Sequence, residues 1–384
     1  MKFSLVQSEL NRSLQLVAGV VPGKTSNPQH LTSVRIEATP EGKLTFTGTD
    51  LDLFLVTTVH GTVEEPGIAS IPARRLLEIV KELPADVVQI ASTASGISVV
   101  CGNGRFRLVG PDPLEFPPVP EMSQDKVFAV ETTVLSRLIN QSSYAVATDY
   151  TRAEQTAVYV HVVNGELRFV ATNGHRLAQA MHPGEYPPWG DILVPPKALS
   201  VLQRLMAEGQ DSVSMSASKR FCLFNLGTSR LYTRLLEGSF PPYEQAIPGD
   251  CDKRAVVDRG VLASALRRVS VFTETGTKMI RLALEKDTIR LSAQSHDVGH
   301  GEEPMPATYD GPPFQIGFNA AYILELLRTM DGEEVELAFK DPTSAGVFTP
   351  IKAEGRPDVL CLVMPLRLPD EVPAETAASL SHES

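Results

Sequence analysis

The chain has 384 residues, of which 42% are hydrophobic and 21% are charged, an ordinary composition for a globular protein with two or three domains. No apolar run approaches the roughly 20 residues that a helix needs to cross a bilayer, and the N-terminal residues MKFSLVQSEL lack the features of a signal peptide. The net charge of −11 argues against nucleic acid as a partner, unless the basic residues gather on one surface.

The first predicted element is an amphipathic helix over Gln7–Val21, with Leu10, Leu14 and Val17 at helical spacing. A strand follows at Leu44–Phe46, and a second helix over 72–83 has a proline near its start, where the missing N–H is harmless. Short strands then complete a unit of helix, strands, helix and strands. This order predicts an α+β fold with helices on one face of an antiparallel sheet.

The same order of elements recurs twice more, at a period of 122 to 127 residues. GKLTFTGTD at position 42 returns as GELRFVATN at 165 and DTIRLSAQS at 287, and IPARRLLEIV at 71 returns as VPPKALSVLQ at 194 and FNAAYILELL at 318. The corresponding helices are predicted over 133–147, 195–207, 259–270 and 318–330, the last with Asn319 as a possible cap. This period matches a small domain rather than a solenoid repeat.

We therefore predict three similar domains over 1–120, 127–248 and 253–368, followed by an acidic, disordered tail over 369–384. Four cysteines are scattered through these domains with no metal-ligand spacing and no sign of a disulfide framework: Cys101, Cys222, Cys251 and Cys361. A reducing cytoplasm is the compartment that this pattern favours.

Charge is segregated between the predicted helices and the rest of the chain. The six helices carry a net charge of +7, which leaves −18 for the remainder of a chain whose total is −11. Eight residues contribute much of the positive charge: Arg12, Arg74, Arg75, Arg137, Lys197, Arg204, Arg267 and Arg268. Each one alone reads as a solubilising surface charge. As a set they indicate that the six helices share a surface that faces a polyanion.

No catalytic constellation is recognisable. The chain has no phosphate-binding glycine loop, no nucleophile elbow and no zinc-protease motif. His296 and His300 are four residues apart, but Gly299 and Gly301 argue against a helix and so against a metal site. His175 is the best-placed histidine, and it fits a structural or binding role better than catalysis. We predict that the protein is not an enzyme and needs no metal or cofactor.

Several motifs resemble the bacterial DNA polymerase sliding clamp, the beta subunit of the replicative polymerase. The most specific are ATNGHRLA (171–178), LEGSFPPYEQAIP (236–248), IGFNAAYILELL (316–327) and LVMPLRL (362–368). The opening MKF, TGTDLDL at 47 and IPARRLLEI at 71 fit the same family, so the resemblance runs to Leu368. ATNGHRLA and MPLRL lack counterparts in the first copy, which assigns partner binding to the second and third domains.

The resemblance implies two chains joined head to tail in a homodimeric six-domain ring that encircles duplex DNA. Such a clamp tethers the replicative DNA polymerase and other proteins with clamp-binding motifs, confers processivity without reading bases, and depends on a clamp loader for opening. Its expected location is the cytoplasm, at the nucleoid, with no membrane partner. The alternative is a clamp-like, peptide-binding scaffold of the same fold that does not encircle DNA.

The resemblance also implies DNA contacts, which are expected from Lys24, Arg74, Arg75, Arg137, Tyr150, Arg152, Lys197 and Arg204. Lys24, Arg74, Arg75 and Lys197 match basic family positions, whereas Arg137 and Arg204 come from the basic helices. The loop at 149–154 departs from relatives that place a glutamine and paired tyrosines there, so only Tyr150 and Arg152 could replace them.

A partner-peptide site is expected between the second and third domains. Its residues, hereafter the partner site, are Thr172, Gly174, His175, Arg176, Leu177, Pro241, Asn319, Tyr322, Val363, Met364, Pro365, Leu366 and Arg367. Apolar side chains with a few polar groups suit a bound peptide, although Leu177, Val363 and Met364 also fit a core. Gln155, Gln245 and Ala246 depart from the family pattern and would shift peptide preference.

The resemblance places ring closure between the first domain of one chain and the third domain of the other. Phe106, flanked by Arg105 and Arg107, matches one side, and Val271 and Phe272 match the other. Glu302 and Glu303 are candidate partners for these arginines. An apolar centre with a charged rim is typical of a stable protein interface.

Overall fold

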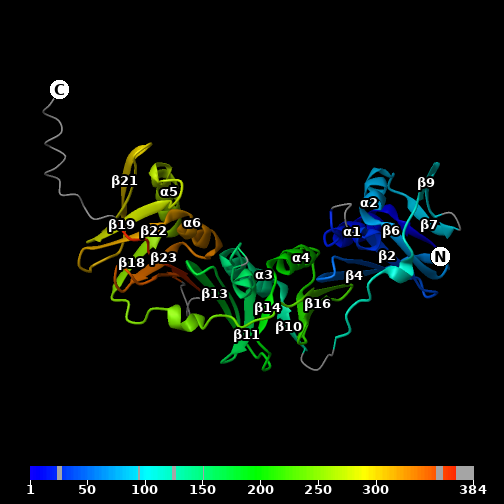
Figure 1. The fold of residues 1–384 in the computed structure, drawn as a ribbon, viewed down its shortest axis with the longest axis horizontal. Helices are drawn as coiled ribbons and strands as arrows, with labels where there is room; N and C mark the ends of the chain where they lie inside the picture. The colour runs from blue at the N-terminus through cyan, green and yellow to red at the C-terminus, as the bar shows by residue number, and fades with distance from the viewer. Residues whose placement is uncertain (24–27, 94–95, 123–126, 150, 352–357, 369–384) are drawn as a thin grey trace. The chain divides into compact units, whose positions relative to one another are not determined.

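The computed structural model describes residues 1–23, 28–93, 96–122, 127–149, 151–351 and 358–368, shown in Figure 1. In the first third the elements are β1 (Lys2–Val6), α1 (Gln7–Ala18), η1 (Gln29–Thr32), β2 (Ser33–Ala38), β3 (Lys43–Thr49), β4 (Leu53–His60), β5 (Thr62–Glu65), β6 (Gly67–Pro72), α2 (Ala73–Glu82), β7 (Val87–Thr93), β8 (Gly96–Cys101), β9 (Gly104–Leu108) and η2 (Pro113–Glu115). The η elements are short 3-10 turns.

The described parts of the other two thirds have a similar order, with four strands between their helices where the first third has five. The middle third contains β10 (Val127–Glu131), α3 (Thr132–Ser142), η3 (Ser143–Ala145), η4 (Ala153–Thr156), β11 (Val158–Val163), β12 (Glu166–Thr172), β13 (Arg176–Pro183), β14 (Ile192–Val194), α4 (Pro196–Met206), β15 (Ser212–Ala217), β16 (Phe221–Leu226), β17 (Ser229–Arg234) and η5 (Tyr243–Ala246). The last third contains β18 (Lys253–Asp258), α5 (Arg259–Val269), η6 (Ser270–Phe272), β19 (Met279–Glu285), β20 (Thr288–Ser295), β21 (Gly299–Pro306), β22 (Phe314–Asn319), α6 (Ala320–Thr329), β23 (Glu334–Phe339), β24 (Gly346–Pro350) and β25 (Val359–Val363).

All six predicted helices are present, but each is shorter than predicted. The first helix of every third is also preceded by a strand (β1, β10 and β18), which the predicted order of helix, strands, helix and strands did not contain. Pro72 and Pro195 sit at the N-caps of α2 and α4, where no N–H is needed. Asn319 caps α6, because its Oδ1 accepts a hydrogen bond from the Ala321 N–H at 2.9 Å.

The described residues form two compact units. Unit 1 comprises residues 1–139, 149–169 and 182–239, and unit 2 comprises residues 140–148, 170–181 and those from 240 onward. Unit 1 contains a five-stranded sheet in the order β5-β1-β7-β8-β9 and an eight-stranded sheet in the order β10-β15-β16-β17-β4-β3-β2-β6. In the second sheet the first and middle thirds join through antiparallel pairing of β17 with β4, which places Tyr232 opposite Phe54.

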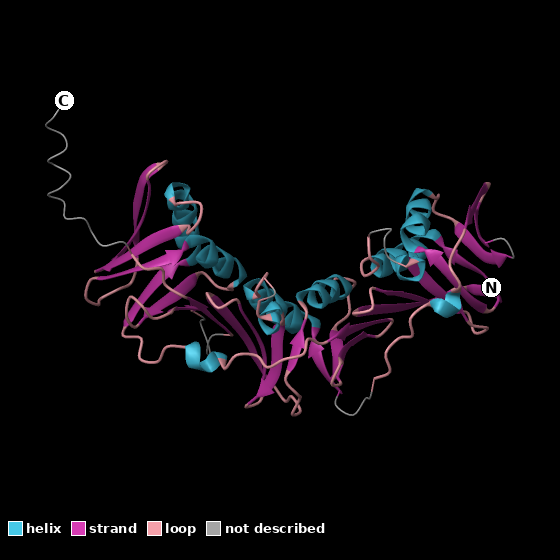
Figure 2. Cartoon of the chain, viewed as in Figure 1, coloured by secondary structure: helices cyan, strands magenta, loops and turns pink. Residues whose placement is uncertain are grey.

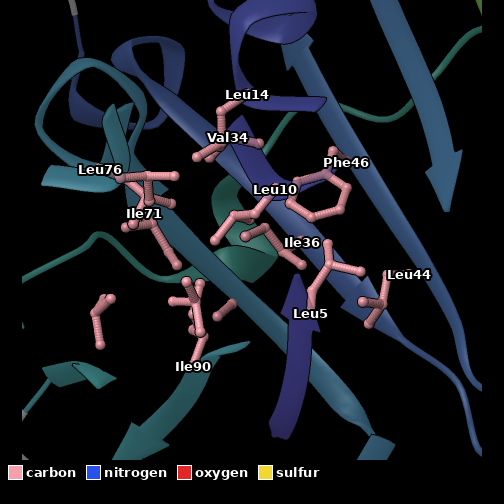
Figure 3. Close-up of a cluster of buried hydrophobic side chains, with 14 of the residues drawn as sticks. Leu5, Leu10, Leu14, Val34, Ile36, Leu44, Phe46, Ile71, Leu76 and Ile90 are labelled. Carbon is pink, nitrogen blue, oxygen red and sulfur yellow. The ribbon is translucent and has the colours of Figure 1, made fainter. Parts of the chain in front are cut away.

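The core of the first third lies between its two helices and the strands of both sheets (Figure 3). Leu10 and Leu14 of α1 and Leu76 of α2 have at most 1% of their surface exposed, and they belong to the same cluster as Ile36 and Phe46. Burying each such side chain contributes about 1.5–3 kcal/mol. The 3.6-residue spacing that predicted α1 therefore corresponds to its buried face.

Unit 2 consists of the residues from 240 onward and two short segments of the middle third. Strands β13-β25-β24-β23-β18 follow one another in one sheet, and β21-β20-β19-β22 form a second sheet. Helices α5 and α6 contact each other and lie against the strands in Figure 2. Phe318, Phe339 and Phe348 pack against one another with ring centroids 5.9–6.4 Å apart, Phe318 stacked on Phe339 and Phe348 edge-on to both. In the part of the chain that is described, no helix has the length and apolar character that a membrane crossing requires.

Candidate functional site

The basic helix residues are mostly exposed, as a surface for a polyanion requires. Arg74 and Arg75 on α2, Lys197 and Arg204 on α4, and Arg152 beside η4 are all exposed in unit 1. Arg267 and Arg268 are exposed on α5 of unit 2. Lys24 and Tyr150, two of the predicted DNA contacts, lie outside the described residues.

Several of these bases already have acidic or polar partners. Arg12 of α1 forms an ion pair with Glu208, which follows the C-terminal end of α4. The Arg204 guanidinium lies directly beside Gly19 at the C-terminal end of α1, and it occupies the space that a side chain at position 19 would need. A cation is favourable there, because the carbonyl end of a helix carries partial negative charge. Helices α1 and α4 therefore contact each other through charged side chains.

Lys197 pairs with a carboxylate that a tight turn presents. Its Nζ contacts Oδ2 of Asp50, in the turn between β3 and β4. Oδ1 of Asp50 accepts hydrogen bonds from the backbone N–H groups of Asp52 at 3.1 Å and Leu53 at 2.7 Å. The Asp50 side chain is 13% exposed, compared with 59% for Lys197. The carboxylate is thus fixed by the backbone, whereas the lysine is the more exposed partner.

Arg137 is a half-buried residue of α3, unlike the exposed bases of α2 and α4. It lies close enough to His182 for its positive charge to disfavour protonation of that imidazole. Burial, and then the positive charge of Arg137, lower the pKa of His182. The Nδ1 of His182 lies 2.6 Å from the hydroxyl of Tyr186. Arg137 therefore has neighbours within the protein, in addition to its predicted role at DNA.

The first part of the partner site is a tight turn before β13. The Thr172 hydroxyl donates to the Arg176 carbonyl at 2.7 Å and accepts the Gly174 N–H at 3.1 Å. Oδ1 of Asn173 accepts the N–H groups of His175 and Arg176, both at 3.0 Å. Gly174 has φ +83°, which favours glycine. The turn leaves His175 exposed.

This turn has a counterpart in the first third, contrary to the prediction that ATNGHRLA has none there. Thr49 Oγ1 donates to the Leu53 carbonyl at 2.7 Å and accepts the Leu51 N–H at 2.9 Å. Leu51 has φ +81°, close to that of Gly174. The backbone of the motif is therefore repeated, whereas the side chains that the turn presents differ.

Arg176 is the centre of the partner site. Its guanidinium carbon lies 5.4 Å from the ring centroid of Tyr144 and 4.7 Å from that of Tyr322. Its Nη2 donates to the Tyr144 carbonyl at 2.6 Å, and its Nη1 pairs with Glu325. Only 12% of the Arg176 side chain is exposed. Two rings, a carbonyl and a carboxylate therefore hold this guanidinium in one position.

Cys361 lies beneath this cluster, with its sulfur 3.2 Å from the Tyr144 hydroxyl. Burial raises the pKa of Cys361 to about 12. Burial also raises the pKa of Tyr144. Neither group is therefore ionised near neutral pH, which suits packing rather than catalysis.

The segment after β25 completes the partner site. The Met364 N–H donates to the His175 carbonyl at 2.8 Å, and the Leu366 N–H donates to the Gly317 carbonyl at 2.8 Å. The segment thus runs from the turn before β13 to strand β22. Met364 is 42% exposed, so it presents apolar surface next to His175.

The thirteen predicted residues differ in exposure. Leu177 and Val363 are buried at 5% and 0%, so they support the site from the core. Tyr322, Pro365, Leu366, Asn319 and Pro241 are partly exposed, and Arg367 is exposed. Sequence reasoning missed Tyr144, Glu325 and Cys361. Only Glu325 had a usable signal, since it lies three residues after Tyr322 on one helix.

The predicted interface residues lie on or beside two strands at sheet ends. Phe106 is 38% exposed on β9, between the exposed Arg105 and Arg107. In unit 2, Val271 is 66% exposed, and the Phe272 ring covers Gly301 of β21 so closely that a side chain there would clash.

The two predicted carboxylate partners of these arginines are engaged within their own chain. Glu302 binds Arg290 at 2.6 Å, and Glu303 binds the Arg268 Nε at 2.9 Å. The Arg268 hydrogen bond lowers the pKa of Glu303. Contacts to a second chain would therefore compete with these pairs.

No group of three or more His, Cys, Asp or Glu side chains is arranged to hold a metal ion among the residues that the structure describes. The candidate surfaces are basic helices, a cluster of apolar and polar groups around Arg176, and two edge strands. All three suit binding.

Comparison with known proteins identifies one family along the chain. The profile of the N-terminal domain of the DNA polymerase III beta subunit matches residues 1–120. The profiles of its central and C-terminal domains match residues 129–242 and 244–367.

Curated relatives and solved structures agree with these profiles. The beta sliding clamp of Caulobacter vibrioides is 32% identical over 379 residues, which cover 96% of this chain and all of the relative. The beta sliding clamp of Pseudomonas putida is 32% identical over 372 residues with the same coverage. A crystal structure of the DNA polymerase sliding clamp from Pseudomonas aeruginosa superposes with a TM-score of 0.91 at 31% identity, covering 96% of this chain and all of that chain.

Proposed function

The chain belongs to the family of bacterial DNA polymerase III beta subunits, and from this premise we propose that it is a sliding clamp. It encircles duplex DNA as a ring of two chains and tethers the replicative polymerase and other partners. The observation that carries this proposal is the match of all three domain profiles, in order, to nearly the whole chain.

The physical requirements of a clamp agree with its surface chemistry. A ring that slides must avoid contacts with base edges, which would hold it at one sequence. Attraction between basic side chains and phosphates does not depend on position along the duplex. Retention then comes from the closed ring. Exposed bases on helices, within a chain of net charge −11, supply local attraction without making the whole surface adhesive.

DNA contacts are proposed for the predicted residues Lys24, Arg74, Arg75, Arg137, Tyr150, Arg152, Lys197 and Arg204. Arg74 and Arg75 are the strongest candidates, because both are exposed on α2. Arg152 is exposed as well, although hydrogen bonds from Thr151, and then the positive charge of Arg152, already lower the pKa of Asp149. Lys197 and Arg204 are engaged with Asp50 and the end of α1, so DNA would have to compete for them.

Partner peptides are proposed to bind the partner site. Met364, Tyr322 and Leu366 offer apolar surface, and backbone and side-chain polar groups around His175 orient a peptide. Phe106 on β9 and Phe272 beside β21 are proposed to meet across the two ring interfaces. The domain limits 1–120, 127–248 and 253–368 belong to the same proposal.

We propose further that the protein has no catalytic activity of its own and works in the cytoplasm, at the nucleoid. A clamp needs no chemical reaction in order to slide. The energy for opening the ring comes from ATP that a separate clamp loader uses. The comparisons do not favour a scaffold that stays off DNA, because the relatives are named as sliding clamps over their full length.

Retention on DNA tests the function directly. The protein is loaded onto nicked circular DNA, isolated by gel filtration, and the DNA is then linearised. A sliding clamp stays on the circle and leaves the linear molecule. Equal retention on both forms, or none on the circle, would contradict the proposal.

A further inference from the structure

One basic residue on α1 and one on α4 each pair with a carboxylate. In both pairs, one residue belongs to the first third of the chain and the other to the middle third. Lys197 of the middle third pairs with Asp50 of the first, and Arg12 of the first pairs with Glu208 of the middle. We propose that Asp50 and Glu208 mask these bases from DNA, so that a phosphate must displace a carboxylate before either base can bind it. This proposal rests on the proposed sliding-clamp function.

The carboxylate of Asp50 is held in place by the backbone, with one oxygen directed at Lys197. Two backbone N–H groups hold Oδ1, which leaves Oδ2 directed at the lysine. The turn that presents it includes Leu51 at φ +81°, a costly conformation for leucine. Thr49 stabilises this turn through two hydrogen bonds. The turn therefore keeps the carboxylate in place whether or not the lysine is bound.

Both bases are accessible enough to change partner. The Lys197 and Arg12 side chains are 59% and 60% exposed, whereas Asp50 and Glu208 are 13% and 34% exposed. An exposed ion pair is weak because water and salt screen it. A phosphate backbone that approaches α1 and α4 can therefore compete for each base, at the expense of an existing contact.

Masking lowers the electrostatic attraction between the protein and DNA, although the basic residues stay on the helices. Each base that neutralises a phosphate steepens the logarithmic salt dependence of DNA binding by about 0.9. Between about 50 and 200 mM salt, one such contact changes affinity about 3.5-fold. A clamp with fewer simultaneous phosphate contacts has fewer contacts to break at each step, and so it diffuses faster along the duplex.

A purely structural role is the competing explanation, since both ion pairs also join the first and middle thirds. The two roles differ in what they change. A structural tie alters the stability of unit 1 and leaves DNA movement unaffected. A mask alters movement on DNA through the base that it releases.

The test compares Asp50→Asn, Glu208→Gln and a matched control, Glu41→Gln, which removes an exposed carboxylate in the turn between β2 and β3. Asparagine keeps the oxygen that the N–H groups of Asp52 and Leu53 need, so the turn is retained. Fluorescent clamps are loaded onto end-blocked duplex DNA, and their one-dimensional diffusion is measured between about 50 and 200 mM salt.

Masking predicts that Asp50→Asn and Glu208→Gln each slow diffusion about two- to fourfold at the low-salt end, with a steeper salt dependence. The control should move like the unmodified protein. In a Lys197→Ala background, Asp50→Asn should have no further effect. Unchanged diffusion in both mask variants, or an Asp50→Asn effect that persists without Lys197, would overturn the proposal. Retention on circular DNA, measured in parallel, separates this result from failure of the clamp function itself.

Discussion

The ion pair between Arg176 and Glu325 provides the sharpest test of the partner site. Glu325→Gln removes the charge of the carboxylate that pairs with the Arg176 guanidinium, and it keeps the shape of the side chain. Arg176 would still stack between Tyr144 and Tyr322 and bond the Tyr144 carbonyl. Only the ion pair with Glu325 would be lost.

The magnitude follows from burial. Breaking a fully buried ion pair costs about 3–5 kcal/mol, and exposed pairs contribute about 0.2–1 kcal/mol. With Arg176 12% exposed and Glu325 43% exposed, the pair lies between these limits, at about 1–2 kcal/mol. If that energy keeps Arg176 in the peptide-binding position, its loss weakens peptide affinity by about 5- to 30-fold.

Fluorescence anisotropy with a labelled clamp-binding peptide measures this loss. Glu325→Asp should recover part of the affinity, because it restores the charge on a shorter side chain. Glu333→Gln, an exposed carboxylate before β23, is the matched control and should bind the peptide normally. Binding by Glu325→Gln within twofold of the unmodified protein would refute the positioning role of this carboxylate.

Three further outcomes are expected. Phe272→Ala should weaken the dimer, measured as a shift to monomer by sedimentation velocity at low concentration; an unchanged dimer would contradict the proposed interface. Gly174→Ala should lower the free energy of unfolding by about 1 kcal/mol, because φ +83° is strained for alanine, and thermal unfolding measures the change. Asn319→Ala should cost a similar ~1 kcal/mol through loss of the α6 cap, with Asn319→Asp as the conservative control.

The helices and the threefold order of elements were predictable because each is encoded locally. Leu10 and Leu14 repeat at helical spacing and are buried together, and the proline before α2 marks its start. Helix ends were predicted less well. The apolar pattern continues through Val20 and Val21, which are buried although α1 stops at Ala18, so burial alone does not define a helix.

The ion pairs could not be predicted, because they join residues that are distant in sequence. Lys197 and Asp50 are 147 residues apart, and Arg12 and Glu208 are 196 apart. The charge count correctly located positive charge on the helices, but it could not show which bases were already paired. Segregated charge in a sequence therefore overstates the charge that is available to a ligand.

The repeated turn shows how one backbone came to serve two purposes. Thr49 and Thr172 make the same pair of hydrogen bonds, and Leu51 and Gly174 share the same positive φ. In the first copy the turn presents Asp50 to Lys197. In the second copy asparagine replaces the aspartate and leads into Arg176 of the partner site. Because the backbone hydrogen bonds are satisfied within the turn, its outward side chains can change without loss of the fold, which is how equivalent positions acquire different partners.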